Sequence, residues 1–412
     1  MTTRPHEESR ETGRDDAPPV RFWSVDEVEA MDFDPFMEEL LQQDSPALVK
    51  LPHGTEPAWV AARYDDVKLV TSDPRFSREA LVGRDVTRLA PHFIPLDDAV
   101  GFADPPEHTR MRKTVAAMFT HRRIEKLRPR AEEIAGRLLD TMERAGPPAD
   151  VMEHLNTPFA LGGMSELMGV PEEDWPKMAK WARLVISAEA GREASEQAKH
   201  DIGAYFADLA AQRLAEPRDD VLSHMAAAER DGRLTHQELV AFAVLMQISG
   251  TNSVRFNSSN MVYLLLTHPD HLARLRAERE LLPQAVDELL RFVPHRNAVG
   301  MARVAVEDVR LGDVTVRRGD PIYVSYLAAN RDPEKFSCPH RMDFDRTFNP
   351  HVSFGSGPHY CVGASLAKME CEVMLGGLLD RFPRLRLAVA PEEIEWRRGE
   401  LIRGPHALPV TW

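Results

Sequence analysis

Apolar residues recur at spacings of three and four along most of the chain between residues 105 and 291. This spacing puts them on one face of an α-helix. The clearest segments are residues 124–142, 202–214 and 239–266. The pattern therefore predicts a core that is built mostly from helices.

A different pattern, in which Val, Ile and Tyr alternate with polar residues, occurs at residues 58–60 and again at 304–326, where Gly319 and Asp320 mark a turn. Alternation of this kind is typical of strands, so we expect a small sheet. No repeat and no Gly/Ser-rich linker divides the chain, which predicts a single domain over residues 21–412. Residues 1–20 are polar and lack an apolar run, which predicts a disordered tail.

Composition narrows the possible functions. The chain of 412 residues is 43% hydrophobic and 28% charged, as in ordinary globular proteins. Its net charge of -14 argues against nucleic acid as a partner. The most apolar stretch, residues 239–248, is shorter than the ~20 residues of a membrane span, so no membrane is expected. Three cysteines without the spacing of a disulfide framework indicate a cytoplasmic protein.

One cysteine lies in an unusual loop. Phe354, Gly355, Gly357, His359, Cys361 and Gly363 occur in a short segment that is followed by an amphipathic run at residues 364–382. The glycines allow a tight turn that a flat ligand can approach closely. The cysteine comes where a helix begins, and the helix dipole there favours a thiolate. A thiolate in this setting can ligate iron and promote cleavage of an oxygen–oxygen bond. Cys338 and Cys371 lack this context and are expected to be packing residues.

The loop resembles the haem-binding segment of the cytochrome P450 family, Phe-Gly-x-Gly-x-His/Arg-x-Cys-x-Gly, at all six positions, and the resemblance extends over nearly the whole chain. It implies a mostly α-helical triangular prism with a small β-sheet region. It also implies haem b bound through Cys361 to its iron, with Phe354, His359 and Gly363 around it, and dioxygen as co-substrate. The activity implied is that of a monooxygenase-type oxidoreductase.

Other segments resemble the family too. His108 and Arg112 are four residues apart, so they share a helix face and can present two cationic donors to carboxylates. By resemblance they bind the haem propionates together with Arg303 and His359. Glu288 and Arg291 can pair on adjacent helical turns, and the resemblance adds Arg341 as the third member of a structural trio.

The sequence departs from the family in the helix over the haem. The usual acid and alcohol that deliver protons correspond to Asn252 and Ser253. An amide cannot carry a proton as a carboxylic acid does, although it can orient water. One hypothesis is that a polar group of the substrate helps to deliver protons. The alternative is that Asn252 and Ser253 anchor a chain of water molecules.

The resemblance also suggests a mostly apolar substrate pocket and separate electron donors. The pocket residues are expected in the loop at 81–99 and in three further segments, and they are Phe93, Leu245, Ile248, Ser249, Ala298, Val299, Met301, Leu401 and Ile402. Such a lining suits a lipophilic secondary metabolite. Electrons are expected from NAD(P)H through a ferredoxin reductase and a ferredoxin, and the protein is expected to be a monomer. Candidate docking cations, each equally explicable as a solvated charge, are Arg110, Lys113, Arg122, Arg123 and Lys368.

Three functions remain open from the sequence. The leading hypothesis is hydroxylation or epoxidation of a small molecule. The second is a reaction at the same haem centre that couples aromatic or diketopiperazine-like natural products without oxygen transfer, or an oxidation that is driven by peroxide. The third, of another class, is a haem-binding sensor without turnover.

Overall fold

The computed structural model describes residues 19–25, 28–43, 45–89, 99–186, 191–295, 299–398 and 401–412. The predicted tail lies almost entirely outside these residues. The α-helices of the described chain are α1 (Pro35–Leu41), α2 (Tyr64–Ser72), α3 (Glu107–Ala116), α4 (His121–Glu125), α5 (Arg128–Ala145), α6 (Thr157–Met168), α7 (Trp175–Ile186), α8 (Gly191–Ala215), α9 (Val221–Arg230), α10 (His236–Thr267), α11 (Pro269–Ala277), α12 (Leu282–Phe292), α13 (Tyr326–Ala329) and α14 (Ala364–Arg381). The prediction of a mostly helical protein is confirmed.

The strands form a small sheet component, as predicted. They are β1 (Arg21–Phe22), β2 (Ala47–Lys50), β3 (Ala58–Ala61), β4 (Phe76–Ser77), β5 (Ala149–Asp150), β6 (Arg303–Ala305), β7 (Val309–Leu311), β8 (Val314–Val316), β9 (Pro321–Val324), β10 (Arg386–Leu387) and β11 (Pro409–Thr411). The largest sheet has the order β1-β2-β3-β9-β6-β4. Within it β3 pairs in parallel with β9, which joins the two segments whose alternation predicted strands.

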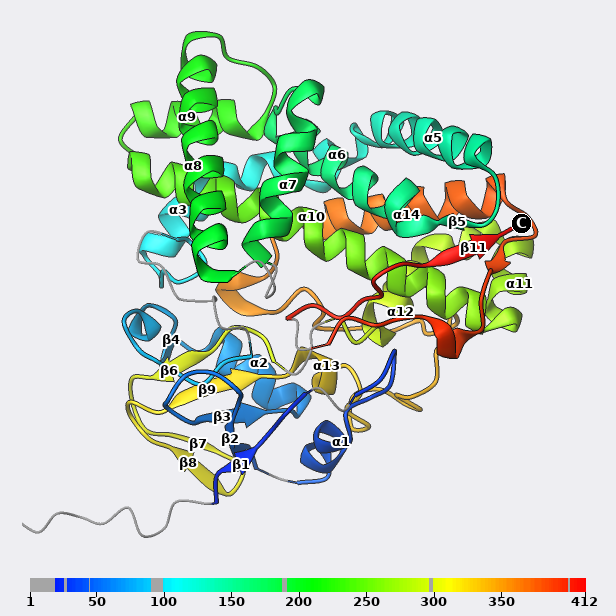
Figure 1. The fold of residues 1–412 in the computed structure, drawn as a ribbon. Coiled ribbons are helices and arrows are strands. Elements are labelled where there is room, and N and C mark those ends of the chain that lie inside the picture. The colour runs from blue at the N-terminus through cyan, green and yellow to red at the C-terminus, as the bar shows by residue number, and fades with distance from the viewer. Residues whose placement is uncertain are drawn as a thin grey trace, which may run out of the picture.

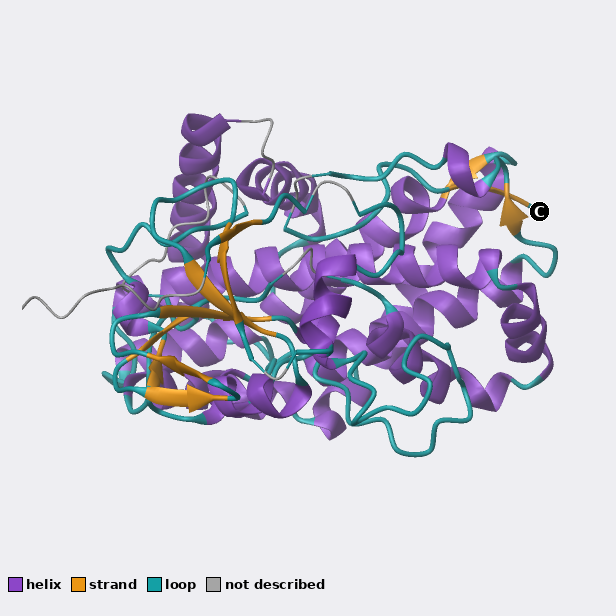
Figure 2. Ribbon diagram, turned by 90° about the horizontal axis from the view of Figure 1, so that it is seen from below, coloured by secondary structure: helices purple, strands orange, loops and turns teal. Residues whose placement is uncertain are grey.

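The sheet and the helices occupy different parts of the molecule. Figure 1 shows the largest sheet and the β7–β8 hairpin on one side. The layer of α5 to α10 and α14 lies on the other side, with α12 and α13 between the two. Figure 2 shows the same division from below, with most strands gathered at one end and a few near the C-terminus at the other. The loop that contains Cys361 and the cationic residues predicted to bind the propionates come from segments near this boundary.

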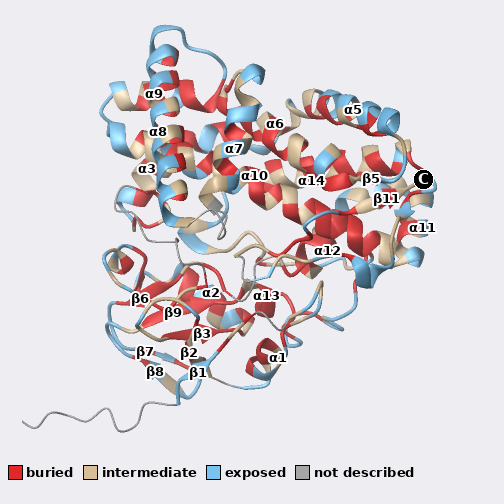
Figure 3. Ribbon diagram, in the orientation of Figure 1, coloured by how far each residue is buried: buried red, intermediate tan, exposed pale blue. Residues whose placement is uncertain are grey.

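Helix α10 is the central helix of the core. Its start is fixed by a capping box, in which Thr235 Oγ accepts a hydrogen bond from the Glu238 backbone N–H and Glu238 in turn bonds the Thr235 backbone. It packs against α6, α8 and α14. Of the described helices, only α10 is long and apolar enough to cross a membrane, a test that core helices also pass. Figure 3 shows much of α10 buried inside the protein, in keeping with a core helix.

Two predicted segments are divided in the structure. The run at 124–142 is not one helix, because α4 ends at Glu125 and α5 begins at Arg128. Pro129 lies in the first turn of α5, where the absence of a proline N–H costs no helical hydrogen bond. The predicted strand region at 304–326 ends instead in α13, whose first turn is capped by Ser325.

Candidate cofactor and active site

The cysteine loop has the tight geometry that its glycines predict. Gly355 and Gly357 have φ angles of 76° and 71°, in the left-handed region that favours glycine. Gly357 also lies against the end of α2, so close that a Cβ atom would meet the Thr71 carbonyl oxygen. The Cys361 backbone N–H donates to the Phe354 carbonyl at 2.9 Å. The loop thus presents an exposed Cys361 just before α14, whose N-cap is Gly363.

The segment after α13 holds this loop in place from behind. Asn330 Nδ2 donates to Ser353 Oγ at 2.8 Å, and Asn330 Oδ1 accepts from the Val352 backbone N–H at 2.7 Å. Ser353 Oγ also donates to the Leu290 carbonyl of α12 at 2.8 Å. Because one asparagine bonds both residues before Phe354, the position of the cysteine is tied to α12 and α13.

A buried ion network supports this frame, and it corrects one prediction. Glu288 and Arg291 are 1% and 0% exposed and form two hydrogen bonds of 2.7 and 2.8 Å. The third member is Arg346, whose Nε lies 3.2 Å from Glu288 Oε2, and not Arg341. The Arg341 side chain is 66% exposed and pairs with Asp343, and only its carbonyl accepts from Arg291. The prediction for Arg341 was wrong because the resemblance places the segment but does not say which of its arginines turns inward.

The four residues expected to hold the haem propionates meet in one cluster. The rings of His108 and His359 are 4.1 Å apart between centroids, although α3 and the cysteine loop are far apart in sequence. Burial, with the neighbouring Arg112 and Arg78, lowers the pKa of His108 to about 4. Burial first, and then the charges of Arg78, His108, Arg303 and Arg112, hold the pKa of His359 well below its usual range. The other cationic residues of the cluster are therefore all within electrostatic reach of His359.

The cluster is short of negative charge. Burial lowers the pKa of Arg112, and Cys361 opposes that shift, so Arg112 also lies near the cysteine. His108 Nδ1 and Arg303 Nη2 are buried, and neither has a hydrogen-bond partner among the residues that the structure describes. Buried polar nitrogens without partners are costly, so they indicate a ligand that accepts hydrogen bonds from Arg303 and, when its Nδ1 carries a proton, from His108. The two carboxylates of haem b, beside a thiolate ligand, match this set in charge and in chemistry.

Arg78 belongs to the same cluster and was missed by the sequence analysis. It is 7% exposed, it lowers the pKa of both histidines, and its Nη1 donates to the Gly101 carbonyl at 3.0 Å. Arg78 follows β4, 30 residues before His108, and nothing in its local sequence distinguishes it from a surface arginine. Only the pairing of β4 with β6, which begins at Arg303, brings the two arginines into one region. We call Arg78, His108, Arg112, Arg303 and His359 the cationic cradle.

Several predicted substrate residues also come together. A Cβ atom at Gly101 would be in ordinary van der Waals contact with both Leu245 Cδ2 and Met301 Cε, so these two side chains lie beside the glycine. Arg78 Nη1 lies 3.8 Å from Met301 Sδ, so this apolar group adjoins the cradle. Ser249 donates to the Leu245 carbonyl within α10. The chain around Gly101, helix α10 and the segment before β6 therefore converge beside the cradle.

The other predicted substrate residues are less closely placed. Val299 is buried in the core cluster near the sheet, and Ile402 packs against the main helical core, as Ile248 does. Leu401 is half-buried in the C-terminal segment. Phe93 and Ala298 lie outside the described residues. Their roles as substrate contacts stay predictions.

The predicted proton-delivery residues lie in the middle of α10. Asn252 is buried, and its Nδ2 donates to the Ile248 carbonyl at 2.9 Å. Ser253 is half-buried. On the side of α10 that faces α6, Gln247 donates to Ser165 Oγ at 3.2 Å. The Asn252 amide is thus held against its own helix, where it can orient a neighbouring group but cannot release a proton as an acid would.

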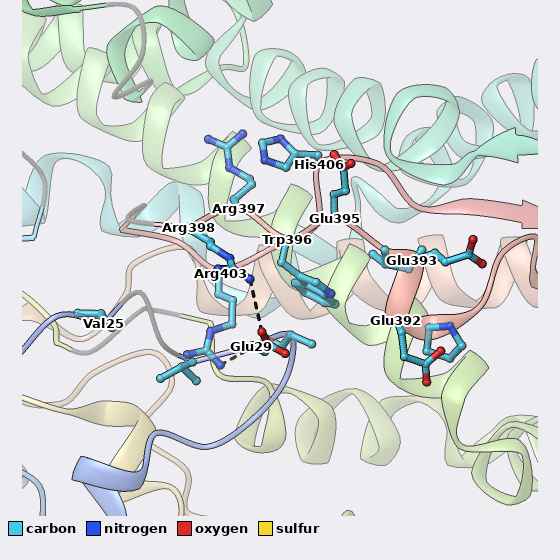
Figure 4. A pocket seen from close by; sticks show the side chains of 14 residues that line it. Val25, Glu29, Glu392, Glu393, Glu395, Trp396, Arg397, Arg398, Arg403 and His406 are labelled. Carbon is cyan, nitrogen blue, oxygen red and sulfur yellow. Dashed lines mark hydrogen bonds and ion pairs between the residues drawn. The ribbon is translucent and has the colours of Figure 1, made fainter.

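A separate cavity of about 440 Å³ lies between residues 25–30 and the segment at 391–406. Figure 4 shows that charged side chains dominate it, with Glu29 facing Arg398 at 3.5 Å. It contains no residue of the cysteine loop or of the cationic cradle. A charged lining of this kind does not suit a lipophilic substrate, so the candidate site is the region around Cys361 and not this cavity.

Comparison with known proteins agrees with this geometry. The family model for cytochrome P450 matches residues 188–395. Biflaviolin synthase of Streptomyces coelicolor is 45% identical over 96% of this chain and 97% of its own. The chain belongs to the cytochrome P450 family.

Two solved P450 structures show the same fold. The LnmA cytochrome P450 hydroxylase from the leinamycin biosynthetic pathway of Streptomyces atroolivaceus is 45% identical, with a TM-score of 0.88 over 95% of this chain and 100% of that one. Cytochrome P450mel 107F1, described as having biaryl coupling reactivity, is 40% identical, with a TM-score of 0.91 over 96% and 100%. The predicted fold class is therefore confirmed.

The family gives the cradle and the loop their chemical meaning. This P450 is an oxidoreductase of the monooxygenase type that uses haem and dioxygen to oxidise a small molecule, and the reading as a sensor without turnover is set aside. When bound, haem supplies the iron at which dioxygen is activated. The residues that would hold it are Cys361 at the iron and the cationic cradle at the propionates. Leu245, Met301 and Gly101 would form an apolar surface beside it, and Asn252 and Ser253 are the residues predicted to take part in proton delivery.

Proposed function

We propose that this P450 hydroxylates or epoxidises a lipophilic secondary metabolite. The observation that carries the proposal is the contact of the apolar group at Gly101, Leu245 and Met301 with the cationic cradle through Arg78. An apolar surface that adjoins the cradle would lie next to the haem that the cradle holds, and such a surface suits a lipophilic molecule. The similarity to a hydroxylase of the leinamycin pathway supports the class of substrate.

A second function has its own support, which is coupling of two aromatic molecules. Biflaviolin synthase and the P450 with biaryl coupling reactivity are both at least 40% identical to this chain. In coupling, each ring loses one C–H hydrogen, a carbon–carbon bond forms, and the two electrons and two protons reduce the oxidant. No oxygen atom enters the product. The altered proton-delivery pair at Asn252 and Ser253 is compatible with such a reaction, because the substrate's own hydroxyl groups can donate protons.

One experiment separates the two functions. A library of aromatic polyketides, macrolides and diketopiperazines is screened for shifts of the haem absorption band, and the compounds that bind are turned over under ¹⁸O-labelled dioxygen. Hydroxylation or epoxidation adds one labelled oxygen atom to the product. Coupling gives a dimer without label. Turnover by hydrogen peroxide without a reductase tests the peroxide-driven alternative in the same assay.

Electrons are proposed to come from NAD(P)H through a ferredoxin reductase and a ferredoxin. Of the candidate docking cations, three are engaged in ion pairs within the chain: Arg110 with Glu107 and Glu238, Arg123 with Asp219, and Lys368 with Asp287. Lys113 and Arg122 are exposed, and among the described residues no ion pair is found for them. These two side chains are therefore the better candidates to attract an acidic ferredoxin.

The docking proposal has a direct test. The double variant Lys113→Glu and Arg122→Glu should slow reduction by a surrogate ferredoxin at low salt, and the difference should shrink as salt is raised. Arg317→Glu, a charge reversal on an exposed turn of the sheet region, serves as the control. Equal rates for the double variant and the control would exclude this face. We further propose that the protein is a cytoplasmic monomer in which residues 21–412 form one domain.

Proton delivery is proposed to rely on the substrate. The Asn252 amide is held by the Ile248 carbonyl and cannot act as an acid. Asn252→Asp restores a carboxyl group at the same place on α10. We expect it to raise the product formed per NAD(P)H consumed with substrates that lack polar groups, and to change little with polar ones. Tight coupling of the wild type with apolar substrates would contradict the proposal and favour a water chain held by Asn252 and Ser253.

A further inference from the structure

Asp104 is an acidic side chain at the edge of the cationic cradle. It lies between β4 and α3, directly before Pro105, at the end of the chain segment that begins after Ser77. Its carboxylate Oδ1 accepts from the Arg78 backbone N–H at 3.0 Å, and its Oδ2 accepts from Ser77 Oγ. One side chain thus bonds two consecutive residues at the other end of the segment.

The hydrogen bonds around Asp104 join the two ends of this segment. Ser77 Oγ also accepts from the Ala80 backbone N–H at 3.0 Å, which holds the first turn of the segment. The Arg78 guanidinium crosses back to the Gly101 carbonyl at 3.0 Å. We call Ser77, Arg78 and Asp104 the loop clasp. It joins the two ends of a segment that includes Gly101 and leads to the apolar group with Leu245 and Met301.

The same aspartate acts on the other side of the cradle. Its carbonyl accepts from the His108 backbone N–H at 2.9 Å and so helps to start α3. Its charge raises the pKa of His108, against the larger lowering by burial and by the arginines. Asp104 is therefore in contact with two cradle residues that come from opposite parts of the molecule, Arg78 beside the sheet and His108 on the helical side.

We propose that Asp104 is a positioning residue that fixes the backbone of Arg78, so that its guanidinium lies in the cationic cradle, and that ties residues 77 and 78 to the chain directly before α3. In this role Asp104 would act through Arg78 and not through a contact of its own with the haem. Because a hydrogen bond to a charged group is stronger than one between neutral groups, the carboxylate holds the Arg78 backbone more firmly than a hydroxyl could. The proposal rests on haem binding at the cradle and is independent of which substrate is oxidised.

Transfer of haem from the holoenzyme to apomyoglobin tests the positioning role. Asp104→Ala and Arg78→Gln should each speed haem loss by about tenfold, which corresponds to about 1.4 kcal/mol. Their double variant should lose haem no faster than the faster single variant, since both changes remove the same contribution. Asp104→Asn keeps an oxygen that can accept from the Arg78 N–H, and it should restore most of the retention.

Hydrogen–deuterium exchange on the holoenzymes tests the clasp. Peptides that cover residues 77–89 should exchange faster in Asp104→Ala, but not in Arg78→Gln, which keeps the carboxylate and the backbone bond. Ser77→Ala, a milder change, should speed exchange of the Ala80 amide and leave most of the haem in place. This variant also decides the question if Asp104→Ala does not fold.

Asp308→Ala is the matched control, because Asp308 likewise accepts from a backbone N–H, that of Arg318, and both residues are exposed parts of the sheet region. Haem loss in Asp104→Ala at the rate of this control would overturn the positioning role. Fully additive effects of Asp104→Ala and Arg78→Gln would show that the two act separately. Unchanged exchange in Ser77→Ala and in Asp104→Ala would show that the loop clasp does not hold this segment together.

Discussion

Two groups of buried arginines in this P450 differ in how they are neutralised. In the network of Glu288, Arg291 and Arg346, the guanidinium groups meet a carboxylate and a set of backbone carbonyls. In the cationic cradle, by contrast, Arg303 Nη2 and His108 Nδ1 have no partner among the residues that the structure describes. The first group is complete in the polypeptide alone, whereas the second requires a ligand.

The difference separates support from binding. A buried ion pair whose partners are all present holds α12 against the segment behind the cysteine loop, and removing one partner leaves an uncompensated charge. A buried cation without an anion is unfavourable until a ligand brings one. The apoprotein therefore stores an electrostatic cost in the cradle, and haem binding relieves it.

The largest expected effect is on folding. Glu288→Ala leaves Arg291 and Arg346 buried without their carboxylate, and it should lower the free energy of unfolding by about 3–5 kcal/mol. Urea unfolding of the apoprotein and the holoenzyme measures it, and both forms should be affected alike. A loss confined to the holoenzyme would mean that the network serves the haem and not the fold.

The opposite pattern is expected in the cradle. Arg303→Met removes a buried charge that has few partners, so the apoprotein should be as stable as the wild type or more stable. Haem binding should weaken by about 2 kcal/mol or more, because the propionates lose a buried cation. Haem titration and urea unfolding report the two quantities, with the exposed Arg317→Met as the control. A less stable apoprotein would break the distinction between the two groups.

The pH dependence of the apoprotein gives a smaller signal. His108 has a pKa of about 4 in the folded protein against the ordinary 6.5, so the unfolded chain binds the proton more readily. Stability should therefore fall as the pH is lowered from about 6.5 toward about 4. His108→Gln should flatten this slope in urea unfolding at several pH values. Haem should flatten it as well, because its carboxylates favour the protonated histidine; an unchanged slope in both cases would count against the cradle.

The smallest effect distinguishes the two candidate arginines of the network. Arg341→Ala changes an exposed side chain and should alter stability by less than about 0.5 kcal/mol. Arg346→Ala removes a charged hydrogen bond to Glu288 and should cost about 1.5–3 kcal/mol. Both are measured by urea unfolding under the same conditions. Equal costs would reinstate Arg341 as the supporting arginine.

Local sequence determined the parts of this protein that depend on short spacing. The six matching positions of the cysteine loop, the periodicity of α10 and the proximity of Glu288 to Arg291 each lie within a few turns of chain. Gly355 and Gly357 predicted a tight turn, and their positive φ angles in the structure agree with that prediction. The prediction of Cys361 as the iron ligand and the confirmed helical fold class both followed from such local patterns.

Tertiary structure decided which distant side chains share a site. Arg346 and Arg341 are both basic residues of one segment, and only packing turned Arg346 inward toward Glu288. Arg78 entered the cradle because β4 pairs with β6, a contact over more than 200 residues of chain that local periodicity does not encode. The physical reason is electrostatic in both cases. The interaction energy of two charges depends on their distance in space and on their burial, whereas a sequence gives only their distance along the chain.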